Sequence, residues 1–148
     1  MDTLLLESNA LHYLIKKLRT VDTLVQFQVM AHSDRYLLFI EYFNTGKFMS
    51  AQTTLDEDWI EEIGERKNFL GGLIQVSVSL YHLTNGNPQG APKIWQKARA
   101  MLEPYGKIME GIDLEKLFKD MDDLYATSND QMSDIDHMKR APKITFQG

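Results

Sequence analysis

The chain has 148 residues, of which 43% are hydrophobic and 25% charged; it has no cysteine, and its formal net charge is −5. This length fits one domain, because domains most often have roughly 100–150 residues. Without cysteine the chain forms no disulfide, no thiolate metal site and no cysteine nucleophile. The excess of 21 Asp and Glu over 16 Lys and Arg argues against nonspecific nucleic-acid binding, which needs positive charge against phosphates.

The first 32 residues are predicted to form a helical extension. Residues 1–7 have no basic region before their run of leucines, so no secretory signal is expected. A stripe of apolar side chains at seven-residue spacing predicts an amphipathic helix that packs on its own domain, joins two chains or binds another protein. The stripe consists of Leu4, Leu11, Leu18 and Val25.

Five further helices are predicted, at about residues 34–43, 47–63, 66–83, 91–105 and 114–126. Asp34 and Asp113 are suitable N-cap residues for the first and last of them. No segment alternates between apolar and polar residues for long enough to indicate a sheet. The fold class is therefore all-α, an antiparallel helical bundle of about five or six helices. Residues 1–126 are expected to form one helical domain, and the polar residues 127–148 a flexible tail.

The helix at about residues 66–83 is predicted to be the buried centre of the bundle, because it is apolar around most of its circumference. The stretch 69–83 is too short and too often interrupted by polar side chains for a membrane span, which needs roughly 20 apolar residues. One stripe of small and polar side chains runs along this helix, within about 60° of Gln75. Its other members are Asn68, Gly71, Gly72, Ser79 and His82. The two glycines indicate that a neighbouring helix approaches closely.

The preceding helix offers a partner surface for this stripe. It is expected to bury apolar residues at three- and four-residue spacing, namely Phe48, Ala51, Leu55, Trp59 and Ile63. Gln52 and Asp56 flank these residues on one face. A short turn would make the two helices antiparallel neighbours, which could bring Gln52 or Asp56 near Gln75, Ser79 and His82. The polar side chains then either form an interhelical hydrogen-bond network or line a ligand or catalytic cleft.

Motifs for known chemistries are absent. The sequence contains no nucleotide-binding glycine loop, no serine-hydrolase elbow, no His-Glu-x-x-His zinc motif and no Glu-x-x-His pair. No metal and no cofactor are therefore predicted.

The middle of the chain resembles the domain of unknown function 309 family. The resemblance covers about residues 37–118 and rests on an ordered series of short segments. They are Phe43–Phe48, Leu55, Trp59, Arg66–Gln75, Leu80–Leu83, Gly86-Asn87, Gly90-Ala91, Leu102–Tyr105 and Gly111–Leu114. The resemblance implies a small all-α bundle of a kind found in bacteria, archaea and plastids, with no agreed activity. Because neither a targeting signal nor a membrane span is seen, a cytoplasmic location is expected, or the plastid stroma in a photosynthetic eukaryote.

Departures from the family pattern bear on activity. Family members usually carry a His-Glu pair where this chain has Gln52 and Thr53, whereas Trp59, Gln75, His82 and Asn87 follow the pattern. Glutamine cannot exchange a proton near neutral pH, and threonine does not replace a carboxylate. An acid–base or metal-binding role of that pair would thus be lost in this chain.

Two functional hypotheses follow from the sequence. The favoured one is a non-catalytic binding or protein-interaction module, acting on a protein partner, a second copy of the chain or a small molecule of unknown identity. Its candidate pocket or polar network comprises Gln52, Asp56, Trp59, Gln75, Ser79, His82 and Asn87. The alternative is a hydrolase-like enzyme in which His82 acts as general base and Asp56 orients it.

Overall fold

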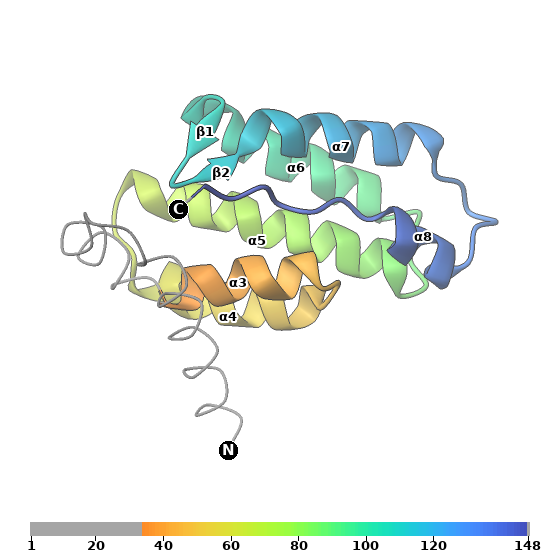
Figure 1. Cartoon of the computed structure of the whole chain (residues 1–148), viewed down its shortest axis with the longest axis horizontal. Helices are drawn as coiled ribbons and strands as arrows, with labels where there is room; N and C mark the ends of the chain where they lie inside the picture. The colour runs from red at the N-terminus through yellow and green to blue at the C-terminus, as the bar shows by residue number, and fades with distance from the viewer. Residues whose placement is uncertain (1–33, 148) are drawn as a thin grey trace, which may run out of the picture.

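The computed structural model describes residues 34–147, which form a helical bundle with one short hairpin (Figure 1). Six α-helices make up the bundle: α3 (Asp34–Asn44), α4 (Phe48–Glu61), α5 (Glu65–Thr84), α6 (Ala91–Leu102), α7 (Leu114–Thr127) and α8 (Asp134–Arg140). The 3-10 helix η2 (Glu103–Tyr105) follows α6, and the strands β1 (Ile108–Met109) and β2 (Ile112–Asp113) precede α7. The predicted all-α class is confirmed. The helical extension predicted for residues 1–32 lies outside the described residues.

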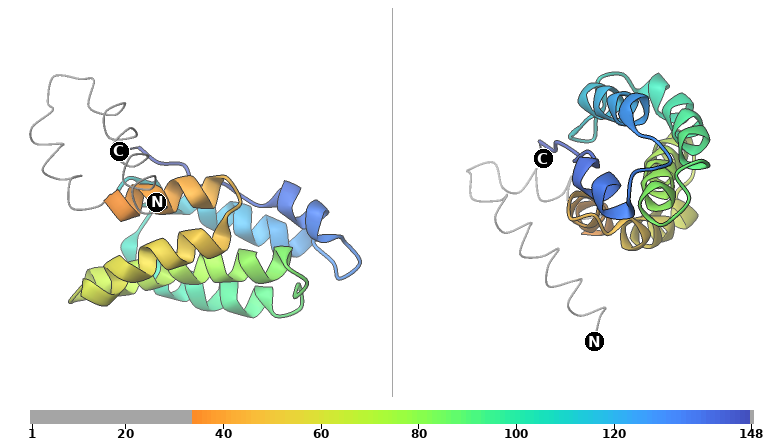
Figure 2. Two further views of the ribbon diagram at one scale, coloured as in Figure 1. Left: turned by 90° about the horizontal axis from the view of Figure 1, so that it is seen from below. Right: turned by 90° about the vertical axis from the view of Figure 1, so that its right-hand side faces the viewer.

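Helix α5 occupies the centre of the bundle, as its apolar circumference predicts. Twelve of its 20 residues are buried. In the end-on view of Figure 2, helices α3 to α7 form an arc in chain order. Helix α8 and the C-terminal segment lie on the open side of that arc. None of the helices between residues 34 and 147 is long and apolar enough to cross a membrane.

The adjacent glycines of α5 permit the close approach that the sequence indicates. A Cβ atom on Gly72 would lie 2.6 Å from Leu102 Cδ2, and one on Gly71 would lie 2.9 Å from Met101 Cε. Both contacts come from α6. The small residues therefore set how closely α5 and α6 pack.

The β-hairpin was not predicted, because strands of two residues cannot show an alternating pattern. β1 and β2 pair antiparallel, with Met109 opposite Ile112. Their turn places Glu110 and Gly111 at positive φ, 46° and 81°. Just after β2, the Asp113 side chain accepts a hydrogen bond of 2.9 Å from Lys116 N, so the predicted N-cap of α7 is present.

The segment after Ala126 is predicted to be a flexible tail, but it forms α8 and an extended stretch that returns along the bundle. Ser133 caps α8 by accepting a hydrogen bond from Asp136 N. His137 is fully buried and Ile144 is 4% exposed. A seven-residue helix and a short extended stretch show no periodicity, which is why the sequence pattern misses them.

Candidate functional site

At Gly71, the polar stripe of α5 contacts side chains of both α4 and α6, which pack on either side of α5. A Cβ atom on Gly71 would touch Met101 of α6 and would lie 3.3 Å from Trp59 Nε1 of α4. Farther along the stripe, Gln75 and His82 are half-buried. Only Ser79 is fully buried among its polar members.

Ser79 binds α6 and α7 rather than α4. Its Oγ donates to Ala91 O at 2.8 Å and lies 2.5 Å from the hydroxyl of Tyr125. Because Ser79 donates its hydroxyl proton to Ala91 O, the hydroxyl of Tyr125 must be the donor to Ser79 Oγ. Ser79 therefore joins three helices and has a structural role. Tyr125, 46 residues farther along the chain, gives no signal in the sequence that it completes this network.

Burial raises the pKa of Tyr125 to about 12, while the hydrogen bond with Ser79 opposes part of this rise. An unfolded tyrosine ionises near pH 10. Between pH 10 and 12 the unfolded chain therefore binds fewer protons than the folded chain at this group, and the free energy of unfolding falls as pH rises.

We expect Tyr125→Phe to lose stability less steeply than wild type between pH 10 and 11.5. The difference in slope approaches about 1.4 kcal/mol per pH unit, the value for one proton. Urea unfolding at several pH values measures it. If the free energy of unfolding fell equally steeply with pH in wild type and variant, Tyr125 would not be the group that titrates. Some slope remains in the variant, because burial also raises the pKa of Tyr36.

His82 and Asn87 form a local pair at the end of α5. Asn87 Nδ2 lies 3.2 Å from His82 Nδ1, and Asn87 N donates to His82 O at 2.9 Å. Asn87 thus stabilises the turn after the helix and engages one nitrogen of the imidazole with an amide group.

The pairing of Asp56 with His82 required by the hydrolase hypothesis is not found in residues 34–147: neither a hydrogen bond nor an ion pair connects them. Trp59 lies against Gly71, so in antiparallel helices Asp56 and Gln75 lie at about the same height. His82 is seven residues beyond Gln75, which at 1.5 Å per residue places it roughly 10 Å farther along the axis of α5 than Asp56. Burial raises the pKa of Asp56, but this carboxylate does not orient the imidazole.

Trp59, Ile60 and Ile63 are three exposed apolar residues close together in the sequence at the end of α4, and we call them the α4 apolar patch. Their exposed fractions are 37%, 68% and 90%. The predictions that Trp59 and Ile63 are buried are both wrong. Ile63 is exposed because α4 ends at Glu61 and Ile63 lies in the turn that follows. Trp59 is only partly covered, with Lys67 Nζ 4.2 Å from the centre of its ring.

Charged residues neighbour the α4 apolar patch in the sequence. Arg35 forms ion pairs with Glu57, Asp58 and Glu61. Asp58 Oδ2 is buried without a hydrogen-bond partner among the described residues. Burial raises the pKa of Asp58, and its hydrogen bond with Arg35 limits the rise.

A second charged group lies on the other side of the α4–α5 turn. Arg66 binds Glu62 at 2.7 Å and both carboxylate oxygens of Glu110 at 2.8 and 2.9 Å. These bonds join the turn to the β-hairpin.

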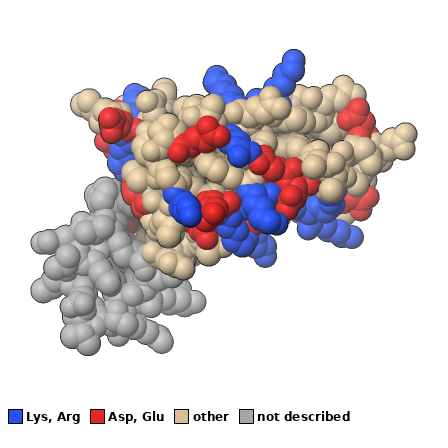
Figure 3. Space-filling view, turned by 90° about the horizontal axis from the view of Figure 1, so that it is seen from above, with Lys and Arg blue, Asp and Glu red and all other residues tan. Residues whose placement is uncertain are grey.

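Charges of both signs are interspersed on the face viewed in Figure 3. On α7 they form pairs one turn apart, Lys116 with Asp120 and Lys119 with Asp123. In addition, Arg99 of α6 pairs with Asp122. Within residues 34–147, no three His, Asp or Glu side chains are grouped as they would be to hold a metal ion.

The fold and these contacts define a small all-α bundle with a half-buried polar stripe and an exposed aromatic residue beside it. A family model, described as Domain of unknown function (DUF309), matches residues 36–94. The match extends from α3 into the start of α6 and confirms the family resemblance. No curated protein and no solved structure matches the chain.

Proposed function

We propose that the protein is a non-catalytic protein-interaction module that binds its partner through the α4 apolar patch. The observation that carries this proposal is the exposure of Trp59, Ile60 and Ile63 within five residues of one another. Exposed apolar side chains gathered at one place, with a polar rim, are typical of protein-binding surfaces.

The composition of the α4 apolar patch supports this role. Tryptophan is enriched among the residues that dominate binding energy at interfaces. Trp59 is held in place by Gly71 below it and Lys67 beside it, so a partner would not have to order its ring. Gln52 and Asp56 precede Trp59 on α4 and supply half-buried polar groups next to the apolar centre.

The charged rim is suited to orienting a partner. Arg35 and Arg66 are each held by at least two carboxylates, and several acidic groups remain partly exposed. A partner with basic residues around an apolar centre would match this surface, because complementary charges fix orientation and speed association.

The test compares two surface variants of the full chain. Ile60→Lys/Ile63→Lys alters the α4 apolar patch, whereas Ile135→Lys alters an equally exposed isoleucine on α8, also 68% exposed. Proteins captured by the chain from its own host are compared across wild type and both variants, and sedimentation at several concentrations detects self-association.

We expect the α4 variant alone to lose its specific partner, or its self-association, by more than about tenfold in affinity, as for loss of central interface residues. Both variants should unfold as wild type does, since surface substitutions usually change stability by less than about 0.5 kcal/mol. Equal binding by wild type and the α4 variant would refute the proposal.

A further inference from the structure

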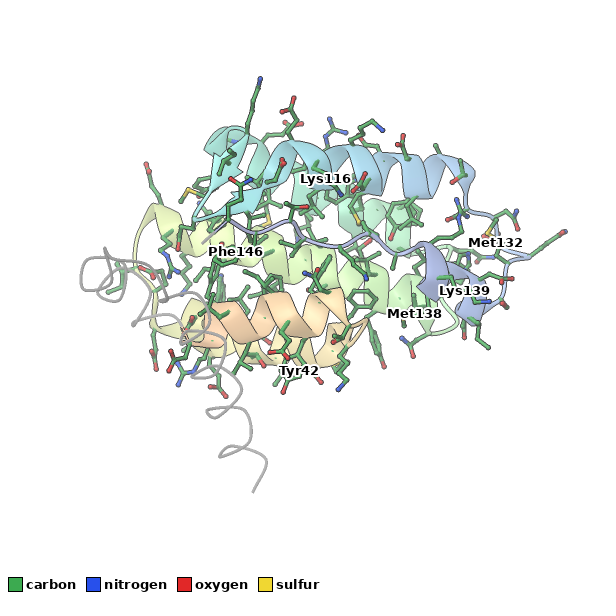
Figure 4. The ribbon with its side chains drawn as sticks, viewed as in Figure 1. Tyr42, Lys116, Met132, Met138, Lys139 and Phe146 are labelled. Carbon is green, nitrogen blue, oxygen red and sulfur yellow. The ribbon has the colours of Figure 1, made fainter. Side chains whose placement is uncertain are left out.

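The last described residues, 141–147, form an extended segment that we call the C-terminal strap. It runs along the open side of the bundle between α3 and α7 (Figures 1 and 2). Phe146 lies at the hairpin end of the bundle, and Met132 and Met138 lie around α8 at the other end (Figure 4).

The strap is bound through its backbone, as a peptide ligand is bound. Asn44 accepts from Ile144 N at 2.7 Å and donates to Ile144 O at 2.9 Å. At the hairpin, Asp113 N donates to Thr145 O at 3.0 Å and Gln147 N donates to Gly111 O at 2.8 Å. Phe146 and Ile112 form an antiparallel bridge. The strap thus adds a strand to the edge of β2, a common mode of peptide recognition.

Two strap side chains enter the bundle. Ile144 is 4% exposed and belongs to the core. Phe146, two residues on and therefore on the same face of the extended chain, packs edge-on against Tyr36 with ring centres 6.2 Å apart. It also covers Gly111, where a Cβ atom would lie 2.5 Å from Phe146 Cε2. The groove therefore accommodates two apolar side chains that are separated by one residue, as Ile144 and Phe146 are.

The start of the strap lies over open surface pockets. Pro142 lines two of them, one of about 560 Å³ against α7 and one of about 210 Å³ against the α3–α4 turn. His137 of α8 is fully buried, and neither ring nitrogen has a hydrogen-bond partner among the described residues. If α8 and the strap were released from the bundle, water could bind both ring nitrogens of His137. This gain favours the released state.

We propose that this groove is a second interaction site, which the strap occupies in the free protein. Its external ligand is an extended segment of a partner protein that carries two apolar side chains separated by one residue. The strap itself defines this chemistry, because the groove binds backbone groups together with Ile144 and Phe146. The site shares no residue with the α4 apolar patch, so each surface succeeds or fails on its own test.

The probe is a labelled, end-capped peptide with the sequence of residues 141–147. The strap is weakened in the full chain by Phe146→Ala/Gln147→Pro, which removes the ring and the hydrogen bond to Gly111. Lys143→Ala, at an exposed strap position, is the matched control. Circular dichroism verifies that each variant keeps the helical content of wild type, and Gln147→Pro alone replaces the double variant if the latter does not.

We expect the peptide to bind the strap-weakened chain at least about tenfold more tightly than wild type or the Lys143→Ala control. In wild type and in the Lys143→Ala control, the intact strap competes with the peptide for the groove at an effective concentration of about a millimolar. Adding Asn44→Ala should weaken peptide binding about tenfold, since two hydrogen bonds are lost.

A folded, strap-weakened chain that does not bind the peptide would overturn the proposal, as would binding that does not depend on Asn44. Sedimentation supplies a further test. A wild-type dimer that is lost in the strap-weakened chain would make a second copy the occupant and would overturn the assignment to a partner protein.

Discussion

Phe69→Ala is expected to lower the free energy of unfolding by about 3–5 kcal/mol, the usual cost of emptying a fully buried aromatic site. Phe69 has no exposed surface. Its ring centre lies 6.4 Å from that of Tyr36 and 5.4 Å from that of Tyr105. It therefore joins central helix α5 to α3 on one side and to η2 on the other.

The two tyrosines cannot close the resulting cavity. Tyr36 donates its hydroxyl to Glu110 O at 2.8 Å, and Tyr105 donates to Glu65 O at 2.5 Å. Movement of either ring would break one of these hydrogen bonds. The cost is a large part of the 5–15 kcal/mol that stabilises a typical domain.

Urea unfolding followed by far-UV circular dichroism measures this loss. Phe69→Leu is the matched control and should cost less than about 1.5 kcal/mol, because it keeps most of the volume. A loss below about 1 kcal/mol in Phe69→Ala would show that Phe69 does not join these elements.

Gly72→Val is expected to lower the free energy of unfolding by about 3 kcal/mol, at the upper end of the range for overpacking a core. The added Cβ would lie 2.6 Å from Cδ2 and 2.7 Å from Cγ of Leu102, which is fully buried. Because Leu102 cannot move into solvent, α6 has to shift away from α5.

Gly71→Ala is the matched control at the neighbouring position. Its Cβ would meet the flexible end of Met101 at 2.9 Å, and alanine gains about 1 kcal/mol of helix propensity over glycine. We expect its stability to stay within about 1 kcal/mol of wild type. Thermal or urea unfolding of both variants tests the contrast, and equal losses would contradict the different roles of the two glycines.

Much of the bundle can be predicted from local sequence. The three- and four-residue spacing of apolar side chains locates α4, α5, α6 and α7, because helical periodicity is a property of neighbouring residues. The Asp113 N-cap and the close approach at Gly71-Gly72 are also local signals. For the same reason, the family resemblance is readable in the short segments within residues 36–94.

The candidate site is only partly predictable, because its residues meet across the fold. Trp59 of α4 lies against Gly71 of the polar stripe, as the helical wheel suggests, and Gln75 of that stripe is half-buried. Ser79, on the same stripe, turns instead to Ala91 and Tyr125. A wheel gives the direction of a side chain but not which neighbouring helix lies there.

What the sequence determines by itself is therefore the helical class, the central place of α5 and the absence of thiol chemistry. Only the tertiary structure decides that Ile63 is exposed, that Asp56 and His82 stay apart and that residues 141–147 bind the groove. The strap depends on Asn44, 100 residues away from Ile144, and on an edge formed by two-residue strands. Such long-range backbone pairing leaves no periodic trace in the sequence, since it depends on where distant segments meet.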